Sequence, residues 1–318
     1  MTPHEILGRY GTAIALIVLI AFNLAFTPNF ATLQTLNVNL TQVCTIVIVA
    51  VGMTLVIATG GIDLSVGSLM AISGALAPMI FMGKLVEVGS IHAAVALAMF
   101  VAIAAATMLG AFNGWLIARF RIQPIVATLV LFIAGRGIAQ VMTNGNLQVF
   151  KVPEFQVIGL GRVFGLPVQV ILMAAIVVAA AFALRRTTFG RQVLAIGGNE
   201  RAARLSGIAT NRIKIAVYAI SGALAGVAGL IVIAINSASD ANLVGMGMEL
   251  DAIAAVAVGG TLLSGGRATI IGTLLGALTI QLVRYTLLAN GVPGAAALVV
   301  KAAIIIGAVW LQERGRAA

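Results

Sequence analysis

Apolar residues along this chain form long runs with few charges, and polar residues gather in the short segments between them. A run of roughly 20 such residues is the length at which an α-helix crosses a bilayer. The runs predict ten crossings, at about residues 11–27, 40–59, 64–82, 92–118, 124–142, 166–184, 214–236, 251–263, 269–289 and 294–311. The pattern therefore predicts an all-α membrane protein with about ten transmembrane helices, some of them interrupted, in a single transmembrane domain over residues 1–318.

Two of these runs need a special interpretation. The eighth, at 251–263, is too short to span a bilayer alone, so it predicts a half-helix or a re-entrant segment. Backbone that breaks at membrane depth is tolerated only inside protein or beside water. The first run follows Arg9 as a signal peptide would, but no small-residue cleavage site follows it, which favours an uncleaved membrane anchor.

A glycine-pair motif occurs twice. The sequence GGIDLS at residues 60–65 is echoed by GGTLLS at residues 259–264, and each copy precedes glycine and an apolar helix. Because six predicted crossings separate the copies, both breaks would face the same side of the membrane. Related halves with broken helices along the substrate path are common in transporters. Glycine pairs also allow close helix packing, and the sequence leaves both interpretations open.

Asp63 lies inside the first of these motifs, next to a long apolar run. An ionised carboxylate at low dielectric costs several kcal/mol or more unless it is paired, neutralised or hydrated. One explanation is that Asp63 caps the free amides of the helix that begins near Leu64, where the helix dipole also favours its charge. The other is a direct role in substrate or proton passage.

Composition and charge support a membrane protein and set its orientation. The 318 residues are 61% hydrophobic and 9% charged, with a mean hydropathy of +1.13. One side of the predicted topology holds most cations, and the other holds Lys84, Lys151 and Arg162. The first group comprises Arg9, Arg119, Arg121, Arg185, Arg186, Arg191, Arg201, Arg204, Arg212, Lys214, Arg314 and Arg316. The positive-inside rule makes that side, with both termini, cytoplasmic, so the net charge of +10 does not indicate nucleic-acid binding.

The longest cytoplasmic connection covers residues 185–211. Within it, Glu200–Leu205 has the pattern of a short amphipathic helix, with Asn199 as its N-cap and Gly207 near its C-terminus. We expect this loop to be part of the membrane domain, since it is too short to form a domain of its own.

The residues of common catalytic and metal sites are missing. The sequence holds no G-x-x-x-x-G-K-[ST] phosphate loop, so any ATP with its Mg²⁺ would have to be bound by a partner chain. Its two histidines and one cysteine, Cys44, form no familiar zinc ligand set. Asp63 and Asp251 lack the Gly-x-Gly-Asp context of intramembrane aspartyl proteases. We therefore expect a chain that is not an enzyme and binds neither cofactor nor metal.

Several polar residues interrupt the apolar runs: Asn113, Gln123, Arg136, Gln140, Gln281 and Arg284. For each residue taken singly, hydrogen bonding between helices is the favoured explanation. As a set they fit a path for a neutral polyhydroxyl solute better than a path for ions. The acidic stretch with Asp240, Glu249 and Asp251 contains no cation, which suggests a partner surface or a helix end.

These motifs resemble a known family. The segment GMTLVIATGGIDLSVGSLMAISG, residues 52–74, resembles the permease subunits of bacterial ABC sugar importers of the ribose, xylose and galactose class. IQPIVATLVLFIAGRGIAQ (122–140) and AIGGNERAARLSGI (195–208) extend the similarity. The runs FRIQPIVATL, AGRGIAQ and DANLVGMGMELDAIAAVAVGG are similar to galactofuranose permeases.

The resemblance implies an inner-membrane permease that pairs with a second copy or a homologous permease. It also implies cytoplasmic ATP-binding subunits and a periplasmic sugar-binding protein as partners. In this family the loop that matches 185–211 supplies a coupling helix for the ATPase. The residues that carry this expectation are Gly198, Asn199, Glu200, Ala202, Ala203, Ser206 and Gly207.

The sequence thus predicts a permease that moves a monosaccharide, galactofuranose or another pentose or hexose, into the cytoplasm by alternating access. The candidate path or gate residues are Asp63, Ser65, Asn113, Gln123, Arg136 and Gln140. The alternative is a proton-coupled secondary transporter of a small polar solute, in which Asp63 would carry the proton. A membrane scaffold without transport activity would leave the broken helices and intramembrane polar residues unexplained.

Overall fold

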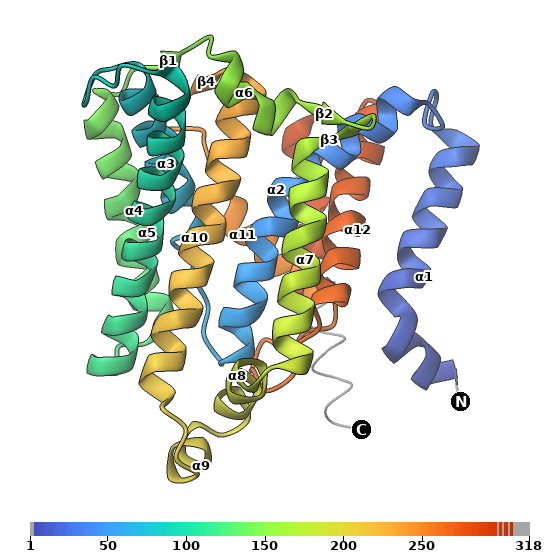
Figure 1. Ribbon diagram of the computed structural model, residues 1–318. Helices are drawn as coiled ribbons and strands as arrows, with labels where there is room; N and C mark the ends of the chain where they lie inside the picture. The colour runs from blue at the N-terminus through green and yellow to red at the C-terminus, as the bar shows by residue number, and fades with distance from the viewer. Residues whose placement is uncertain (1–2, 298, 301, 305, 308–318) are drawn as a thin grey trace.

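The computed structural model describes residues 3–297, 299–300, 302–304 and 306–307, which fold into a bundle of helices (Figure 1). The long helices are α1 (Pro3–Phe26), α2 (Leu33–Ala58), α4 (Ile91–Phe120), α5 (Pro124–Thr143), α7 (Val168–Arg186), α10 (Thr210–Asn236) and α12 (Ile270–Ala289). The shorter ones are α3 (Val66–Phe81), α6 (Pro153–Leu160), α8 (Thr188–Gly198), α9 (Glu200–Leu205) and α11 (Met248–Val258).

The predicted all-α membrane fold is confirmed. Six of the described helices, α2, α4, α5, α7, α10 and α12, are long and apolar enough to cross a membrane. Each of the first nine predicted crossings coincides with a helix. The tenth, at 294–311, lies partly outside the described residues.

Short strands lie at one end of the bundle, with α8 and α9 at the other (Figure 1). β1 (Gln148–Val149) pairs antiparallel with β4 (Ala238–Ser239), and β2 (Arg162–Val163) pairs with β3 (Leu166–Pro167). Gln148 pairs with Ser239, so the segment after α5 lies beside the segment after α10.

Helix α2 forms the centre of the bundle. All its side chains from Val43 to Ala58 are buried, because α7, α10, α11 and α12 pack around it. A helix that is apolar on every face suits this enclosed position, because none of its faces requires water. Helix α4 packs most extensively against α10, where Gly110 and Gly222 let the two backbones approach closely.

The two copies of the glycine-pair motif adopt the same backbone conformation. After α2, Gly60 adopts φ +81° and the amide of Gly61 donates to the carbonyl of Val56 at 3.2 Å. After α11, Gly260 adopts φ +80° and the amide of Thr261 donates to the carbonyl of Val256 at 3.2 Å. Both breaks thus end a helix with the same glycine-dependent turn.

Both breaks lie at the end of the bundle that carries α8 and α9. The amide of Gly266 donates to the carbonyl of Ala58 at 3.1 Å, so the two breaks touch one another. Each is followed or preceded by a short helix: α3 has 16 residues and α11 has 11. At 1.5 Å per residue α11 is only about 16 Å long, half the thickness of the hydrocarbon core. The eighth predicted crossing is therefore a half-helix.

Candidate transport path and coupling surface

Asp63 lies in a fully enclosed polar cluster at the start of α3. Its Oδ1 accepts hydrogen bonds from the amide of Ser65 at 3.0 Å and from the hydroxyl of Ser65 at 2.6 Å. Its Oδ2 accepts from the hydroxyl of Ser221 on α10 at 2.8 Å. Asn113 on α4 donates to the Ser65 hydroxyl at 3.1 Å. Three predicted path residues, Asp63, Ser65 and Asn113, therefore lie together.

This cluster is sealed inside the subunit: Asp63 and Ser65 are 0% exposed and Asn113 is 1% exposed. Asp63 accepts the amide of Ser65 in the turn just before α3, and Ser65, the N-cap residue of α3, makes no side-chain capping bond. The same carboxylate joins the break to α10, and Asn113 joins it to α4. A role of these three residues in substrate passage stays a prediction.

Arg136 and Gln140 reach from α5 to the segment that leads into the half-helix α11. The guanidinium of Arg136 donates to the carbonyl of Ala241 at 2.8 Å, to that of Val244, and to that of Gly67 on α3 at 3.3 Å. Gln140 donates to the side-chain oxygen of Asn242 at 2.8 Å. One side chain thus holds the entry to α11 against the start of α3.

The position of the Arg136 guanidinium shows that the acidic stretch does have a cation beside it. Asp240 and Glu249 were interpreted as part of an acidic stretch without a cation, but both interact electrostatically with Arg136. The sequence reasoning failed because the cation is supplied by α5, over a hundred residues earlier in the chain.

Gln123 lies apart from the other candidates. It is exposed at the N-terminal end of α5 and lines a cavity of about 700 Å³ that also borders α9 and the first break. Among its other lining residues are Arg121, Glu200, Arg204 and Lys214. The cavity therefore belongs to the α8–α9 end of the bundle.

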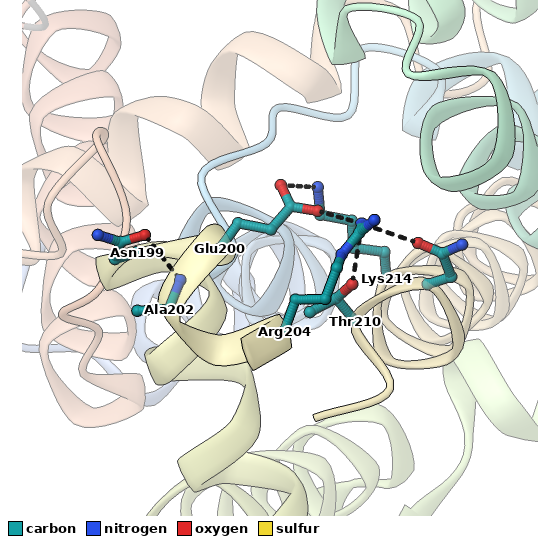
Figure 2. A network of polar contacts seen from close by, with 7 residues as sticks. Asn199, Glu200, Ala202, Arg204, Thr210 and Lys214 are labelled. Atoms are coloured by element: carbon teal, nitrogen blue, oxygen red, sulfur yellow. Dashed lines mark hydrogen bonds and ion pairs between the residues drawn. The ribbon is translucent and has the colours of Figure 1, made fainter. Parts of the chain in front are cut away.

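The loop 185–211 forms the two helices α8 and α9. Helix α9 covers Glu200–Leu205, as predicted, and the side-chain oxygen of Asn199 accepts from the amide of Ala202 at 3.0 Å (Figure 2). Gly207 adopts φ +84° after the helix ends. The N-cap and the C-terminal glycine expected from the sequence are both confirmed.

Glu200 fastens α9 to the membrane helix that follows. Its carboxylate accepts from Lys214 of α10 at 2.7 Å and from Arg204 at 3.5 Å (Figure 2). Arg204 also donates to Thr210 at 3.3 Å and to Asn211 at 3.5 Å. The short helix is therefore held in a fixed orientation on the N-terminal end of α10.

The faces of α9 differ in what they present. Ala203 is buried against the bundle, whereas Ala202 and Ser206 are exposed. Leu205 is 90% exposed, an isolated large apolar side chain in a polar loop. The sequence analysis missed Leu205, although an apolar residue within NERAARLSG was the available signal.

A glycine contact connects α8 to both helix breaks. A Cβ atom at Gly197 would collide with the carbonyl of Ala58 and the amide of Gly266, whereas a Cβ at Gly198 would meet nothing within 4 Å. Backbone therefore lies directly against backbone at Gly197. We call Gly197, Ala58 and Gly266 the glycine junction. The sequence reasoning selected Gly198 but not Gly197.

The part of the chain that the structure describes contains no candidate metal-binding site. No three His, Cys, Asp or Glu side chains gather there in a way that could hold an ion. The single cysteine, Cys44, is buried in α2.

Comparison with known proteins identifies relatives over most of the chain. The family model described as "Branched-chain amino acid transport system / permease component" matches residues 36–309. The ribose import permease protein RbsC of Escherichia coli (strain K12) is 44% identical over 95% of this chain and 92% of that protein. The galactofuranose transporter permease protein YtfT of the same strain is 39% identical, over 86% of this chain and 78% of that protein.

A third relative is the fructose import permease protein FruF of Bifidobacterium longum (strain NCC 2705). It is 38% identical over 77% of this chain and 67% of that protein. No solved structure matches the chain significantly. The family description names amino acids, but these three relatives are named as sugar permeases, as the resemblance of residues 52–74 implied. The chain belongs to this permease family, and within it to the permease subunits of bacterial ABC sugar importers.

Proposed function

We propose that this permease carries a pentose or hexose into the cytoplasm by alternating access, with ribose and galactofuranose as the first candidate sugars. The names of the relatives support this choice of solutes. The ribose permease has the higher identity, 44% against 39%, so ribose is the sugar to test first.

ATP and Mg²⁺ would be bound by a cytoplasmic partner chain that docks on α9. The observation that carries this proposal is the exposure of Leu205 on a short helix that Glu200 and Lys214 hold in place. Removing an exposed Leu side chain from water contributes about 1.5–3 kcal/mol, so a partner that covers Leu205 would be stabilised on α9. Its position next to Ala202 and Ser206 agrees with the coupling role that the family resemblance implies for this loop.

The assembly would include two further components. A second copy or a homologous permease completes the membrane unit, and a periplasmic sugar-binding protein delivers the sugar from outside. The chain would lie in the bacterial inner membrane with both termini in the cytoplasm. The concentration of Lys and Arg in the loops on the α8–α9 side supports this orientation.

The glycine junction suggests how the partner acts on the membrane domain. Movement of α9 would pass through α8 to Gly197, and from there to Ala58 and Gly266, at the ends of the two breaks. Broken helices form the substrate sites of many transporters, and access to these sites changes when one bundle rocks against the other. A displacement of α9 by the ATP-binding partner would thus reach both helix breaks through backbone contacts.

The rival proposal, proton coupling through Asp63, is less well supported. The carboxylate already accepts three hydrogen bonds, from the amide and hydroxyl of Ser65 and from the Ser221 hydroxyl. A proton would have to reach the one remaining lone-pair site of Oδ2 inside a cluster in which Asp63 and Ser65 are 0% exposed. The geometry fits a structural role better than a cycle of proton uptake and release.

Affinity purification of the tagged chain from its own membranes, followed by reconstitution, tests the proposal. Recovery of an ATP-binding subunit and ATP-dependent uptake of ribose or galactofuranose would support it. Uptake by vesicles that hold this chain alone, driven by a proton gradient, would contradict it and favour the secondary transporter.

A further inference from the structure

The cavity of about 700 Å³ at the α8–α9 end of the bundle carries an excess of positive charge. Its charged lining residues are four cations and one carboxylate, namely Arg121, Arg201, Arg204, Lys214 and Glu200, which together have a formal charge of +3. Glu200 accepts from both Lys214 and Arg204, so its single negative charge is shared between two cations. We call this space the cationic cavity. Cations gathered in one hollow favour an anionic occupant.

Arg121 and Arg201 supply most of the excess charge. Both side chains are exposed, and neither forms an ion pair with any residue that the structure describes. Arg121 lies at the C-terminal end of α4 and Arg201 on α9, so the two come from different elements of the cavity wall. The N-terminal end of α5 borders the same space through Gln123 and Pro124, and its helix dipole adds to the positive potential.

Aromatic side chains place the cationic cavity at the depth of the lipid headgroups. Trp115 and Phe120 on α4 are both exposed, and their ring centroids lie 5.0 Å apart. Exposed Trp is typical of the boundary between the hydrocarbon core and the headgroups. Arg121 follows about 9 Å of helix beyond Trp115. With the α8–α9 end on the cytoplasmic side, the cavity opens where the phosphates of the cytoplasmic leaflet lie.

A phospholipid phosphate fits this position better than a soluble anion. It brings a negative charge to the headgroup depth, while its acyl chains can lie along exposed apolar side chains such as Phe120 and Ile125. Ile117 and Ile122 give the cavity lining an apolar part that can contact the first methylene groups of the lipid. Basic pockets between transmembrane helices on the cytoplasmic side bind the headgroups of anionic lipids in this way.

We propose that the cationic cavity binds the phosphate of an anionic phospholipid, with Arg121 and Arg201 as its main contacts. The bound headgroup joins the end of α4 to α9 and so restrains α9. Ala202 and Ser206 do not line the cavity and stay available to an ATP-binding partner, whereas Leu205 borders both surfaces. The lipid would thus lie directly beside the docked partner and regulate how firmly α9 is held. The site does not depend on which sugar is carried.

Native mass spectrometry of the purified chain tests the site. The chain is titrated with phosphatidylglycerol or with phosphatidylcholine of the same acyl chains, and phosphatidylglycerol should bind more tightly. The double variant Arg121→Gln/Arg201→Gln should weaken phosphatidylglycerol binding about 25-fold, because each cation near the membrane surface contributes about fivefold in affinity. The matched control Arg191→Gln/Arg212→Gln removes two exposed arginines that do not line the cavity and should leave this affinity unchanged.

Hydrogen exchange tests the contact with α9. Phosphatidylglycerol should slow amide exchange of residues 200–206 severalfold in the native chain and in the control variant, but not in Arg121→Gln/Arg201→Gln. Equal affinity for the two lipids, or an equal loss in the control variant, would overturn the site. Displacement of the lipid by inorganic phosphate would also overturn it, in favour of a soluble anion. Loss of the ATP-binding subunit from the double variant with unchanged lipid affinity would overturn it in favour of that partner.

Discussion

Asp63 and Ser221 lie 158 residues apart in the sequence, yet the Ser221 hydroxyl donates to the Asp63 carboxylate at 2.8 Å inside the bundle. This bond joins the first helix break to α10, the helix that begins directly after the α9 loop. It also explains why a charged residue is retained next to a long apolar run. The carboxylate is stabilised by its three donors and joins elements that must stay in contact.

The Asp63 cluster predicts a difference between two substitutions. Asp63→Ala leaves the Ser65 amide and two serine hydroxyls without their acceptor, at about 1–3 kcal/mol for each donor that stays unsatisfied. Asp63→Asn keeps one acceptor oxygen and caps well. We therefore expect a large fall in the thermal unfolding temperature for Asp63→Ala and a small one for Asp63→Asn. Sugar uptake should survive in Asp63→Asn, and its complete loss in a folded variant would favour the proton-coupled alternative.

Arg136 should stabilise the entry to α11. Arg136→Gln removes the charge near Asp240 and Glu249 and several hydrogen bonds to backbone carbonyls. Hydrogen bonds to charged groups contribute about 1.5–3 kcal/mol each. We expect faster amide hydrogen exchange over residues 240–250, measured by mass spectrometry. Arg191→Gln, which changes an exposed arginine on α8, is the control and should leave this exchange unchanged.

Leu205 should control coupling without affecting folding. Leu205→Glu changes a side chain that is 90% exposed, so the unfolding temperature should not move. Loss of an interface anchor costs about 2 kcal/mol or more of binding free energy. Co-purification of the ATP-binding subunit and ATP-driven uptake should both fall sharply. Leu147→Glu, at an exposed position on the opposite end of the bundle, is the matched control, and an equal loss of co-purification there would contradict the assignment.

The glycine junction predicts opposite results for neighbouring residues. Gly197→Ala forces a methyl group against the carbonyl of Ala58, and overpacking of this kind costs about 1–3 kcal/mol. Gly198→Ala meets nothing within 4 Å and should be tolerated. We expect reduced stability and reduced uptake per ATP hydrolysed for Gly197→Ala alone. The same loss in Gly198→Ala would show that the contact at Gly197 is not the cause.

The sequence predicted the features of this fold that depend on local pattern. Apolar runs located the helices because each must span or enter the bilayer core, and Asn199 with Gly207 delimited α9 because capping is a local interaction. The glycine pairs located both helix breaks. These signals need no knowledge of which helices are neighbours.

Contacts between helices could not be predicted in the same way. The partner of Arg136 lies on a segment more than a hundred residues away, and the Asp63 cluster forms only where α4 and α10 pack beside the start of α3. Which face of an apolar helix meets which neighbour depends on packing of small residues, for which the hydropathy pattern carries no information. The exposure of Leu205 likewise becomes visible only once α9 is placed on α10.

The glycine junction makes the two halves of the domain mechanically dependent on each other. Because Gly197 touches Ala58, the last residue of α2 before the first break, and Gly266, which follows the second break, we expect one displacement of α8 to act on both breaks together. We expect the two helix breaks of one subunit to move together. A time-resolved measurement of the conformation at one break should therefore give the same single time course as a measurement at the other.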